Sequence, residues 1–170
     1  MDFIEGLPRS GGKTIVLVVV DSLSKFAHFI ALSHPFTARI VAASYIENVY
    51  KLYGTPRTIV SDRDGLFLSE FWKEFWAMQG SKLLYNTTFY PQIDGQTEVV
   101  NMCLENYLRC FCSNKPRDWV KWLAWARFWY NTNWHCSIKV SPYQALYGRP
   151  LPPLLTILLE LPGCNWLRMN

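Results

Sequence analysis

Two acidic residues stand in surroundings that suggest chemistry. Asp62 follows the β-branched segment Thr58-Ile59-Val60 and precedes a turn-forming Asp-Gly pair. An acidic side chain where a strand's carboxyl end meets a loop has the usual site position of an open α/β sheet. Glu98 stands near the start of a predicted helix, off its apolar stripe, with Asn101 on the same side. A lone carboxylate commonly caps a turn or faces a helix dipole, so it is the pair that indicates a site.

The elements that must position these carboxylates alternate between strand and helix periodicity. The patterns predict an antiparallel meander of strands at 3–4, 14–20 and 25–32, a helix over 37–53, and a strand at 58–60. A helix capped by Ser69 and a strand at 82–85 follow, and then a long helix after the polar segment 86–95. Asp118 is expected to cap another helix, to about 133, and Ser141-Pro142 opens a short one. The order β-β-β-α-β-α-β-α-α-α predicts an α/β fold, a five-stranded mixed sheet with helices on both faces.

Composition excludes several classes. The 170 residues suit one domain, and 50% hydrophobic with 18% charged residues is too apolar for a disordered chain. The net charge of +4 permits a phosphate-bearing partner without requiring one. No apolar run reaches the roughly 20 residues of a membrane span, and no signal peptide is expected. The five cysteines form no C-x-x-C pair, which favours reduced thiols and an intracellular protein.

Five longer motifs resemble the integrase catalytic core of gypsy-type long-terminal-repeat retrotransposons, a relative of retroviral integrases. They are MDFIEGLP at 1–8, VVVDSLSKFAHFI at 18–30, IVSDRD at 59–64, YPQIDGQTE at 90–98 and SPYQALYGR at 141–149. The resemblance treats residues 1–155 as one catalytic core and leaves 156–170 as a divergent C-terminal tail. It implies a ribonuclease H-like fold, and it makes us expect a fragment of a larger polyprotein.

Carried over by position, the resemblance implies a catalytic, metal-binding triad of Asp2, Asp62 and Glu98. The 35 residues between Asp62 and Glu98 match the family's D,D-35-E pattern. Asp21 is the rival for the first position, but the resemblance favours Asp2 and leaves Asp21 as a turn residue. Three carboxylates suit two Mg²⁺ or Mn²⁺ ions. The implied reactions are 3′-end processing of element DNA and strand transfer into target DNA, with the nucleus as the expected place of action.

Other residues carry weaker expectations. Five could contact DNA near the site: Arg63, Gln92, Asp94, Gln96 and Asn101. Asp64 and Asp94 are interpreted mainly as loop-structuring, His28 as structural, and Arg63, Lys82 and Lys121 mainly as solvated surface. The tryptophan-rich stretch 119–134 predicts either core packing or a contact in a homo-oligomer.

Two other functions stay open. One is a catalytically inactive integrase remnant that acts only as a nucleic-acid-binding or self-associating domain. Met102, where the family typically has an arginine, favours this alternative because a phosphate contact is lost. The other is a different nuclease or transposase of the ribonuclease H-like fold, which would not explain the segment 90–98.

Overall fold

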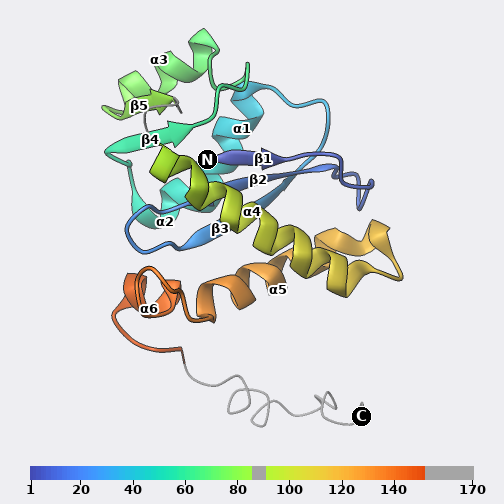
Figure 1. Cartoon of the computed structure of the whole chain (residues 1–170). Helices are drawn as coiled ribbons and strands as arrows, with labels where there is room; N and C mark the ends of the chain where they lie inside the picture. The colour runs from blue at the N-terminus through green and yellow to red at the C-terminus, as the bar shows by residue number, and fades with distance from the viewer. Residues whose placement is uncertain (86–90, 152–170) are drawn as a thin grey trace.

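A three-stranded antiparallel sheet lies at the centre of the molecule (Figure 1). The computed structural model describes residues 1–85 and 91–151, with side chains in the second range from Thr97 onward. Strands β1 (Asp2–Ile4), β2 (Ile15–Val20) and β3 (Ala27–Leu32) form the predicted meander, with Asp2 opposite Val18. The apolar run of β2 forms the middle strand, and its residues are buried up to Val19.

The fourth and fifth predicted strands form a separate parallel pair. Strands β4 (Thr58–Ser61) and β5 (Lys82–Tyr85) are joined through helix α3 (Glu70–Met78). All five predicted strands therefore form, with mixed directions, but hydrogen bonding divides them into two sheets. The three-residue β1 pairs only with β2, and the Met1 amino group reaches β4 by donating to the Val60 carbonyl at 2.7 Å.

The predicted helix over 37–53 is continuous but changes its winding. It consists of α1 (Ala38–Tyr45), the π-helical η1 (Ile46–Tyr50) and α2 (Lys51–Tyr53). The Thr37 hydroxyl accepts a hydrogen bond from the Ile40 amide and caps its start. Gly54 ends it at φ 77°, a conformation that a glycine adopts without strain.

The C-terminal half of the described chain is helical. Helix α4 (Pro91–Cys112) begins within the segment predicted to be a turn, and it is followed by the 3₁₀ turn η2 (Pro116–Asp118), α5 (Trp119–Thr132) and α6 (Pro142–Tyr147). The expected cap by Asp118 is wrong: its side chain makes no capping hydrogen bond. Because the preceding 3₁₀ turn holds Asp118 at φ −105° and ψ 8°, its carboxylate instead pairs with Lys121 at 3.0 Å.

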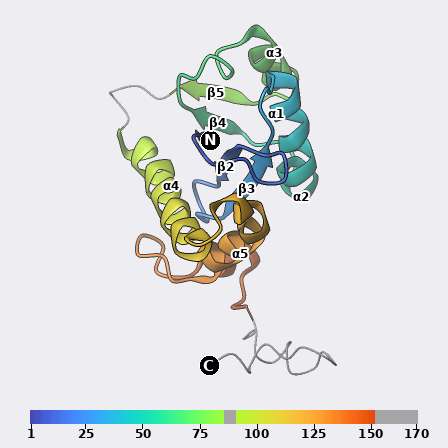
Figure 2. The same cartoon turned by 90° about the vertical axis from the view of Figure 1, so that its right-hand side faces the viewer.

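Helices cover both faces of the central sheet, as predicted (Figure 2). On one face Val16, Val18 and Phe29 pack with α4 and α5. On the other, Leu17 and Ile30 join α1, η1 and the tryptophans of α3. Side chains alternate along a strand, so β2 supplies both cores. Asp2 has the same parity as Ile4 and therefore faces the α4 side.

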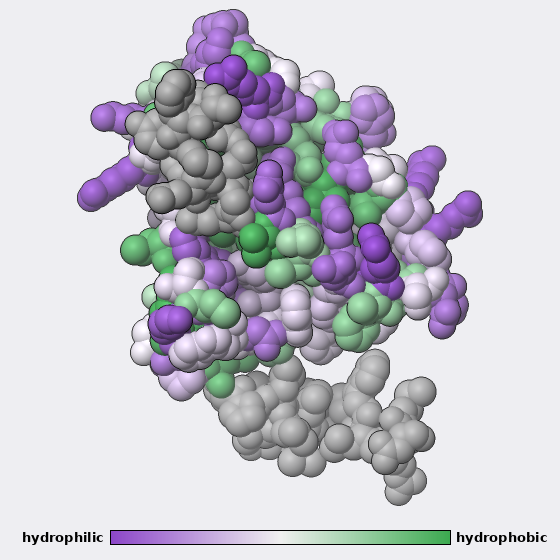
Figure 3. Space-filling view, viewed as in Figure 1, coloured by the Kyte–Doolittle hydropathy of each residue, from purple (hydrophilic) through white to green (hydrophobic). Residues whose placement is uncertain are grey.

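The tryptophan-rich stretch is only partly core. Trp119 is buried, whereas Trp125, Trp129 and Trp134 are 50%, 41% and 67% exposed. The face seen in Figure 3 carries apolar patches among polar side chains.

The cysteines in the described ranges are free thiols: Cys103, Cys110, Cys112 and Cys136. Within those ranges no helix is long and apolar enough to cross a membrane. The predicted tail 156–170 lies outside the described residues.

Candidate active site at the ends of β1 and β4

Asp2 is held from two directions at the start of β1. Its Oδ1 accepts a hydrogen bond from the Phe3 amide at 2.8 Å. Its Oδ2 accepts from Nδ2 of Asn101, on α4, at 2.6 Å. The two contacts fix the orientation of a half-buried carboxylate by one local and one long-range bond. Such outer contacts orient a carboxylate that serves as a metal ligand.

Asp62 lies beside Asp2, at the first position after β4. Its Oδ1 accepts a long hydrogen bond from the Asp64 amide at 3.3 Å. Partial burial raises the pKa of Asp62, and the negative charges of Asp2 and Asp64 raise it further. The Asp64 amide and the Met1 amino group act in the opposite direction. The net result is a carboxylate whose charge is disfavoured, as expected for a partly buried acid with like charges nearby.

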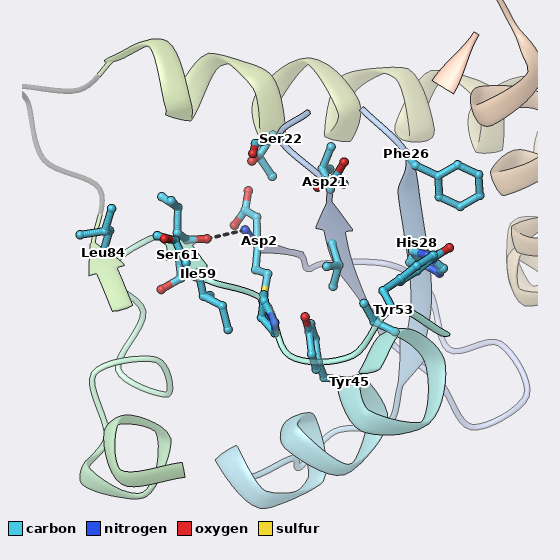
Figure 4. Close-up of a pocket in the computed structure, with 18 of the residues that line it drawn as sticks. Asp2, Asp21, Ser22, Phe26, His28, Tyr45, Tyr53, Ile59, Ser61 and Leu84 are labelled. Carbon is cyan, nitrogen blue, oxygen red and sulfur yellow. Dashed lines mark hydrogen bonds between the residues drawn. The ribbon is translucent and has the colours of Figure 1, made fainter. Parts of the chain in front are cut away.

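A cavity of about 600 Å³ opens at these carboxylates. Figure 4 shows Asp2 between Ser61 at the end of β4 and Asp21 with Ser22 after β2. The cavity continues inward to Tyr45 and His28. Two buried polar atoms on its lining residues have no hydrogen-bond partner: the Ser61 hydroxyl oxygen and Nδ1 of His28. The cavity is therefore acidic at its mouth and mixed in character inside.

The structure does not bring Glu98 into this cavity. Glu98 is exposed on α4, although its neighbour Thr97 lines the cavity. Asn101 contacts Asp2, and Glu98 precedes Asn101 by about one helical turn. Glu98 therefore lies one turn along α4 from the contact between Asn101 and Asp2. Among residues 1–85 and 91–151, no three His, Cys, Asp or Glu side chains are arranged to hold a metal ion. The role of Glu98 as third ligand stays a prediction.

The five expected DNA contacts have different positions. Arg63 is exposed beside Asp62, whereas Asn101 faces inward and binds Asp2. Gln92, Asp94 and Gln96 belong to the α4 backbone, but their side chains lie outside the described residues.

The two other aspartates near the site structure their own turns. The Asp64 carboxylate accepts from the Leu66 amide at 2.7 Å, in agreement with its loop-structuring interpretation. Oδ2 of Asp21 accepts from the Ser24 amide and hydroxyl at 2.7 and 2.6 Å. Asp21 thus organises the turn between β2 and β3, as predicted, while it also lines the cavity.

Sequence reasoning missed one residue and only partly anticipated another. Ser61 is the residue that was missed. It is 2% exposed, and at this strand end the sequence motif indicated a role only for its neighbour Asp62. Asn101 was expected near the site, but its contact with Asp2 joins residues 99 positions apart. No local pattern in the sequence carries such a contact.

The donor chemistry of the cavity mouth fits a hard divalent cation. Asp2 and Asp62 supply carboxylate oxygens, the ligands that Mg²⁺ prefers over nitrogen or sulfur. Burial, and to a smaller extent the charges of Asp2 and Asp64, raise the pKa of Asp62, and a bound cation would favour the charged form of both carboxylates. His28 lies deeper in the cavity, with its Nε2 3.1 Å from the Tyr53 hydroxyl.

The chain is similar in sequence to polyproteins of transposons. The chain is 35% identical over 165 residues to the transposon Tf2-3 and Tf2-4 polyproteins of Schizosaccharomyces pombe. The match covers 96% of this chain and 12% of each polyprotein, so the chain spans about an eighth of those relatives. No protein-family model matches the chain.

Solved structures of integrases resemble the chain in fold. The HTLV-2 integrase catalytic core domain in complex with magnesium, in its trimeric form, superposes with a TM-score of 0.65 at 18% identity. That superposition covers 85% of this chain and 93% of the other. A chain of the simian T-cell lymphotropic virus intasome in complex with the PP2A regulatory subunit B56 gamma gives 0.71 at 17% identity, covering 89% and 55%. The fold is therefore the ribonuclease H-like fold of integrase catalytic cores.

The two comparisons agree with the motif resemblance. The fold is that of integrase catalytic cores, and the motif resemblance implies the same fold. The chain is similar over nearly its whole length to one segment of the Tf2 transposon polyproteins, in agreement with the fold.

Proposed function

We propose that this domain transfers polynucleotide strands: it trims the 3′ ends of element DNA and joins them to target DNA. The observation that carries the proposal is that Asp2 and Asp62, at neighbouring strand ends, line the same cavity. The similarity to transposon polyproteins and the magnesium in a structural relative support it. Glu98 completes the D,D-35-E triad in this proposal.

The residues of the chain hold and orient the reacting groups. Asp2, Asp62 and Glu98 would bind two Mg²⁺ ions, which supply charge stabilisation for the attacking and leaving oxygens of an in-line displacement at phosphorus. Asn101 keeps Asp2 aimed at the cavity mouth, and the Asp64 amide does the same for Asp62. In strand transfer a DNA 3′-hydroxyl oxygen forms the new bond to phosphorus, and the 3′-oxygen of the target strand leaves. No covalent protein intermediate is required.

The decisive experiment measures strand transfer of a labelled terminal-repeat oligonucleotide with Mn²⁺ or Mg²⁺. Asp62→Asn should reduce the rate at least about 100-fold, since even outer-shell changes at metal sites lower activity 10–100-fold. Glu70→Gln, at an exposed carboxylate paired with Lys73, is the matched control and should retain activity. Equal activity of the Asp62→Asn and Glu70→Gln variants would refute the proposal. Glu98→Gln tests the third ligand separately.

A non-catalytic DNA-binding or self-associating domain is the second candidate. The exposed position of Glu98, outside the cavity that Asp2 and Asp62 line, favours it. In that case the unmodified chain binds DNA but gives no product with either metal, and Asp62→Asn leaves its DNA affinity unchanged. A labelled RNA–DNA hybrid in the same assay tests for the activity of a general ribonuclease H-like nuclease.

We also propose self-association through α5. Its exposed Trp125 and Trp129 lie on the outside of the helical layer, and the HTLV-2 core relatives are described in trimeric and dimeric forms. Burial of two large aromatic side chains favours protein contacts. Trp125→Glu should shift the sedimentation coefficient toward that of a monomer, and Phe71→Glu, on the exposed side of α3, is the control.

A further inference from the structure

A second cavity, of about 520 Å³, lies between α2, α5, α6 and the start of β3. We call it the aromatic cavity, after the six rings that line it: Phe26, Tyr53, Trp125, Phe128, Tyr143 and Tyr147. Three of these side chains stay about half exposed, Tyr53 at 43%, Trp125 at 50% and Tyr147 at 51%. Packing among the described residues therefore leaves apolar surface uncovered around a space of the size of small-molecule sites.

Most polar groups on the wall of the aromatic cavity already have partners. The Asn131 side chain is fully paired with the β3 backbone, and the Thr132 hydroxyl donates to a carbonyl of α5 at 2.8 Å. The Tyr53 hydroxyl lies 3.1 Å from Nε2 of His28, and burial and a hydrogen bond with Tyr147 raise the pKa of Tyr53. These groups hold the wall together, so they contribute little to the choice of a ligand.

Arg127 differs from them because its charge is not paired. Among the described residues that line the cavity, Arg127 alone carries a full charge at neutral pH. In the part of the chain that the structure describes, its guanidinium forms no ion pair, whereas Lys73 and Lys121 each do. Burial and then the charge of Arg127 lower the pKa of His28, so the field of this cation reaches the cavity wall. A guanidinium presents donors in a planar fork that matches a carboxylate.

The rings and the cation together define a class of ligand. Flat aromatic walls suit a flat apolar body, which stacks on them or meets their edges. Aromatic walls can also hold a cation, but here no carboxylate from the described residues lines the cavity, and Arg127 repels a positive charge. A strongly polar molecule would lose its hydration against the rings without new hydrogen bonds. The remaining class has an aromatic body and a single negative group.

We propose that the aromatic cavity is a binding site for small organic acids with an aromatic body. The ring of the acid packs against Trp125 and Phe128, and its carboxylate accepts hydrogen bonds from the Arg127 guanidinium. Neither Asp2 nor Asp62 lines this cavity, so the site lies apart from the candidate active site. The proposal does not depend on catalysis, because its readout is binding in the absence of metal.

The first test compares three naphthalene compounds that differ in charge: naphthylacetate, naphthylethanol and naphthylethylammonium. Equilibrium dialysis against the full chain at neutral pH, in buffer with EDTA, keeps metal chemistry out of the measurement. The acid should bind with a Kd of about 0.1–1 mM, which is in the range for a ligand of its size. It should bind at least about 5-fold tighter than the alcohol, and the ammonium compound should bind most weakly.

Two variants locate the binding in the aromatic cavity. Arg127→Met should bring the Kd of the acid to within about 2-fold of that of the alcohol, because only the acid uses the guanidinium. Lys121→Met, at an exposed cation of the same helix that pairs with Asp118, is the matched control and should keep the preference. Ala124→Trp adds a ring at an exposed position on the cavity wall and should weaken acid and alcohol alike, at least about 10-fold. Circular dichroism checks that each variant is folded.

Three results would overturn the proposal directly. They are equal affinity of the unmodified chain for the three compounds, an acid preference that survives Arg127→Met, and binding that Ala124→Trp leaves unchanged.

Two further results would overturn it by assigning the cavity to another occupant. Affinity that falls as protein concentration rises and a dimer forms would assign it to a second copy, since Trp125 also lies on the proposed self-association face. Acid binding that becomes at least about 10-fold tighter after Leu154→Ser with Leu155→Ser would assign it to the C-terminal segment of this chain.

Discussion

Two asparagines join helices to strands in this domain, and the two junctions differ in how fully their polar atoms are paired. Asn131 of α5 is 3% exposed, and its amide both accepts from the Ala27 backbone N–H and donates to the Ala27 carbonyl, each at 2.8 Å. Asn101 of α4 donates to Asp2, but its Oδ1 is buried without a partner.

This difference separates a structural junction from a functional one. The Asn131 side chain pairs with the Ala27 backbone at the edge of β3 as a neighbouring strand would. Its amide oxygen and nitrogen and the Ala27 N–H and carbonyl all have hydrogen-bond partners. At Asn101 the structure tolerates an unpaired oxygen on the side chain that contacts Asp2. Buried polar groups are nearly always paired, and exceptions gather where a site has requirements other than stability.

The largest expected effect breaks the structural junction. Asn131→Ala leaves the Ala27 N–H and carbonyl buried without partners, and this should lower the free energy of unfolding by about 2–4 kcal/mol. Thermal unfolding followed by circular dichroism should show a Tm lower by about 5–15 °C. Asn133→Ala, at the exposed end of the same helix, should stay within about 0.5 kcal/mol of the unmodified chain. Similar Tm values for the two variants would show that the Ala27 bonds contribute little.

The next prediction concerns His28, which follows Ala27 on β3 and lines the cavity that reaches Asp2. Burial and the positive charge of Arg127 lower the pKa of His28 to about 4. The unfolded chain therefore takes up this proton first, near pH 6.5, and stability falls as pH drops from 6.5 toward 4, by at most about 3 kcal/mol. Urea unfolding from pH 7.5 to 4.5 should show a shallower pH dependence for His28→Gln. Parallel profiles for the two proteins would contradict this.

Asn101→Ala tests the functional junction and should give the opposite pattern to Asn131→Ala. It removes an unpaired buried oxygen along with one hydrogen bond, so stability should change by less than about 1 kcal/mol. Asp2 loses its outer contact, and Mn²⁺ affinity by titration calorimetry should weaken about 10–100-fold. The control is Asn106→Ala, exposed on the same helix. A large loss of stability with unchanged Mn²⁺ affinity would make Asn101 a structural residue like Asn131.

The smallest effect is a gain of stability. Because the pKa of Asp62 is raised in the folded state, its ionised form disfavours folding at neutral pH. Asp62→Asn should therefore raise Tm slightly at pH 7 in a chelating buffer. The difference should shrink as pH falls through the folded pKa of Asp62 toward the ordinary value of 3.8. Glu105→Gln, at an exposed carboxylate of α4, should show no such gain. A lower Tm for Asp62→Asn would contradict the cost of burying the Asp62 charge beside Asp2 and Asp64.

Local patterns predicted the elements well where one residue type decides the geometry. Ser69 caps α3 through the Trp72 amide and Ser141 caps α6 through the Gln144 amide, as their sequence positions indicate. The prediction for Asp118 was wrong because Asp118 ends a 3₁₀ turn that sets its backbone angles, and a side-chain preference alone does not predict that turn. The start of α4 was also missed, because the Asp-Gly pair in 86–95 favours a turn.

The candidate site was predictable only in part. Motif resemblance named Asp2 and Asp62, and the fold brings them together by packing β1 against β4. Three other features arise from contacts between distant segments. They are the hydrogen bond of Asn101 to Asp2, the burial of the Ser61 hydroxyl, and the hydrogen bonds between Asn131 and Ala27. Such contacts depend on how helices sit on the sheet, and a periodic pattern fixes only which face of a helix is apolar.

The π-helical segment Ile46–Tyr50 makes the length of its helix adjustable at one place. A π-helical turn closes on i→i+5 hydrogen bonds and an α-helical turn on i→i+4, so this segment holds one residue more than an α-helical turn would. Loss of one residue here would let the segment become α-helical and keep the residues after it in nearly the same orientation. Tyr53, whose hydroxyl meets His28, would then stay on the cavity wall. A single-codon deletion in this stretch is therefore the length change that the cavity tolerates best.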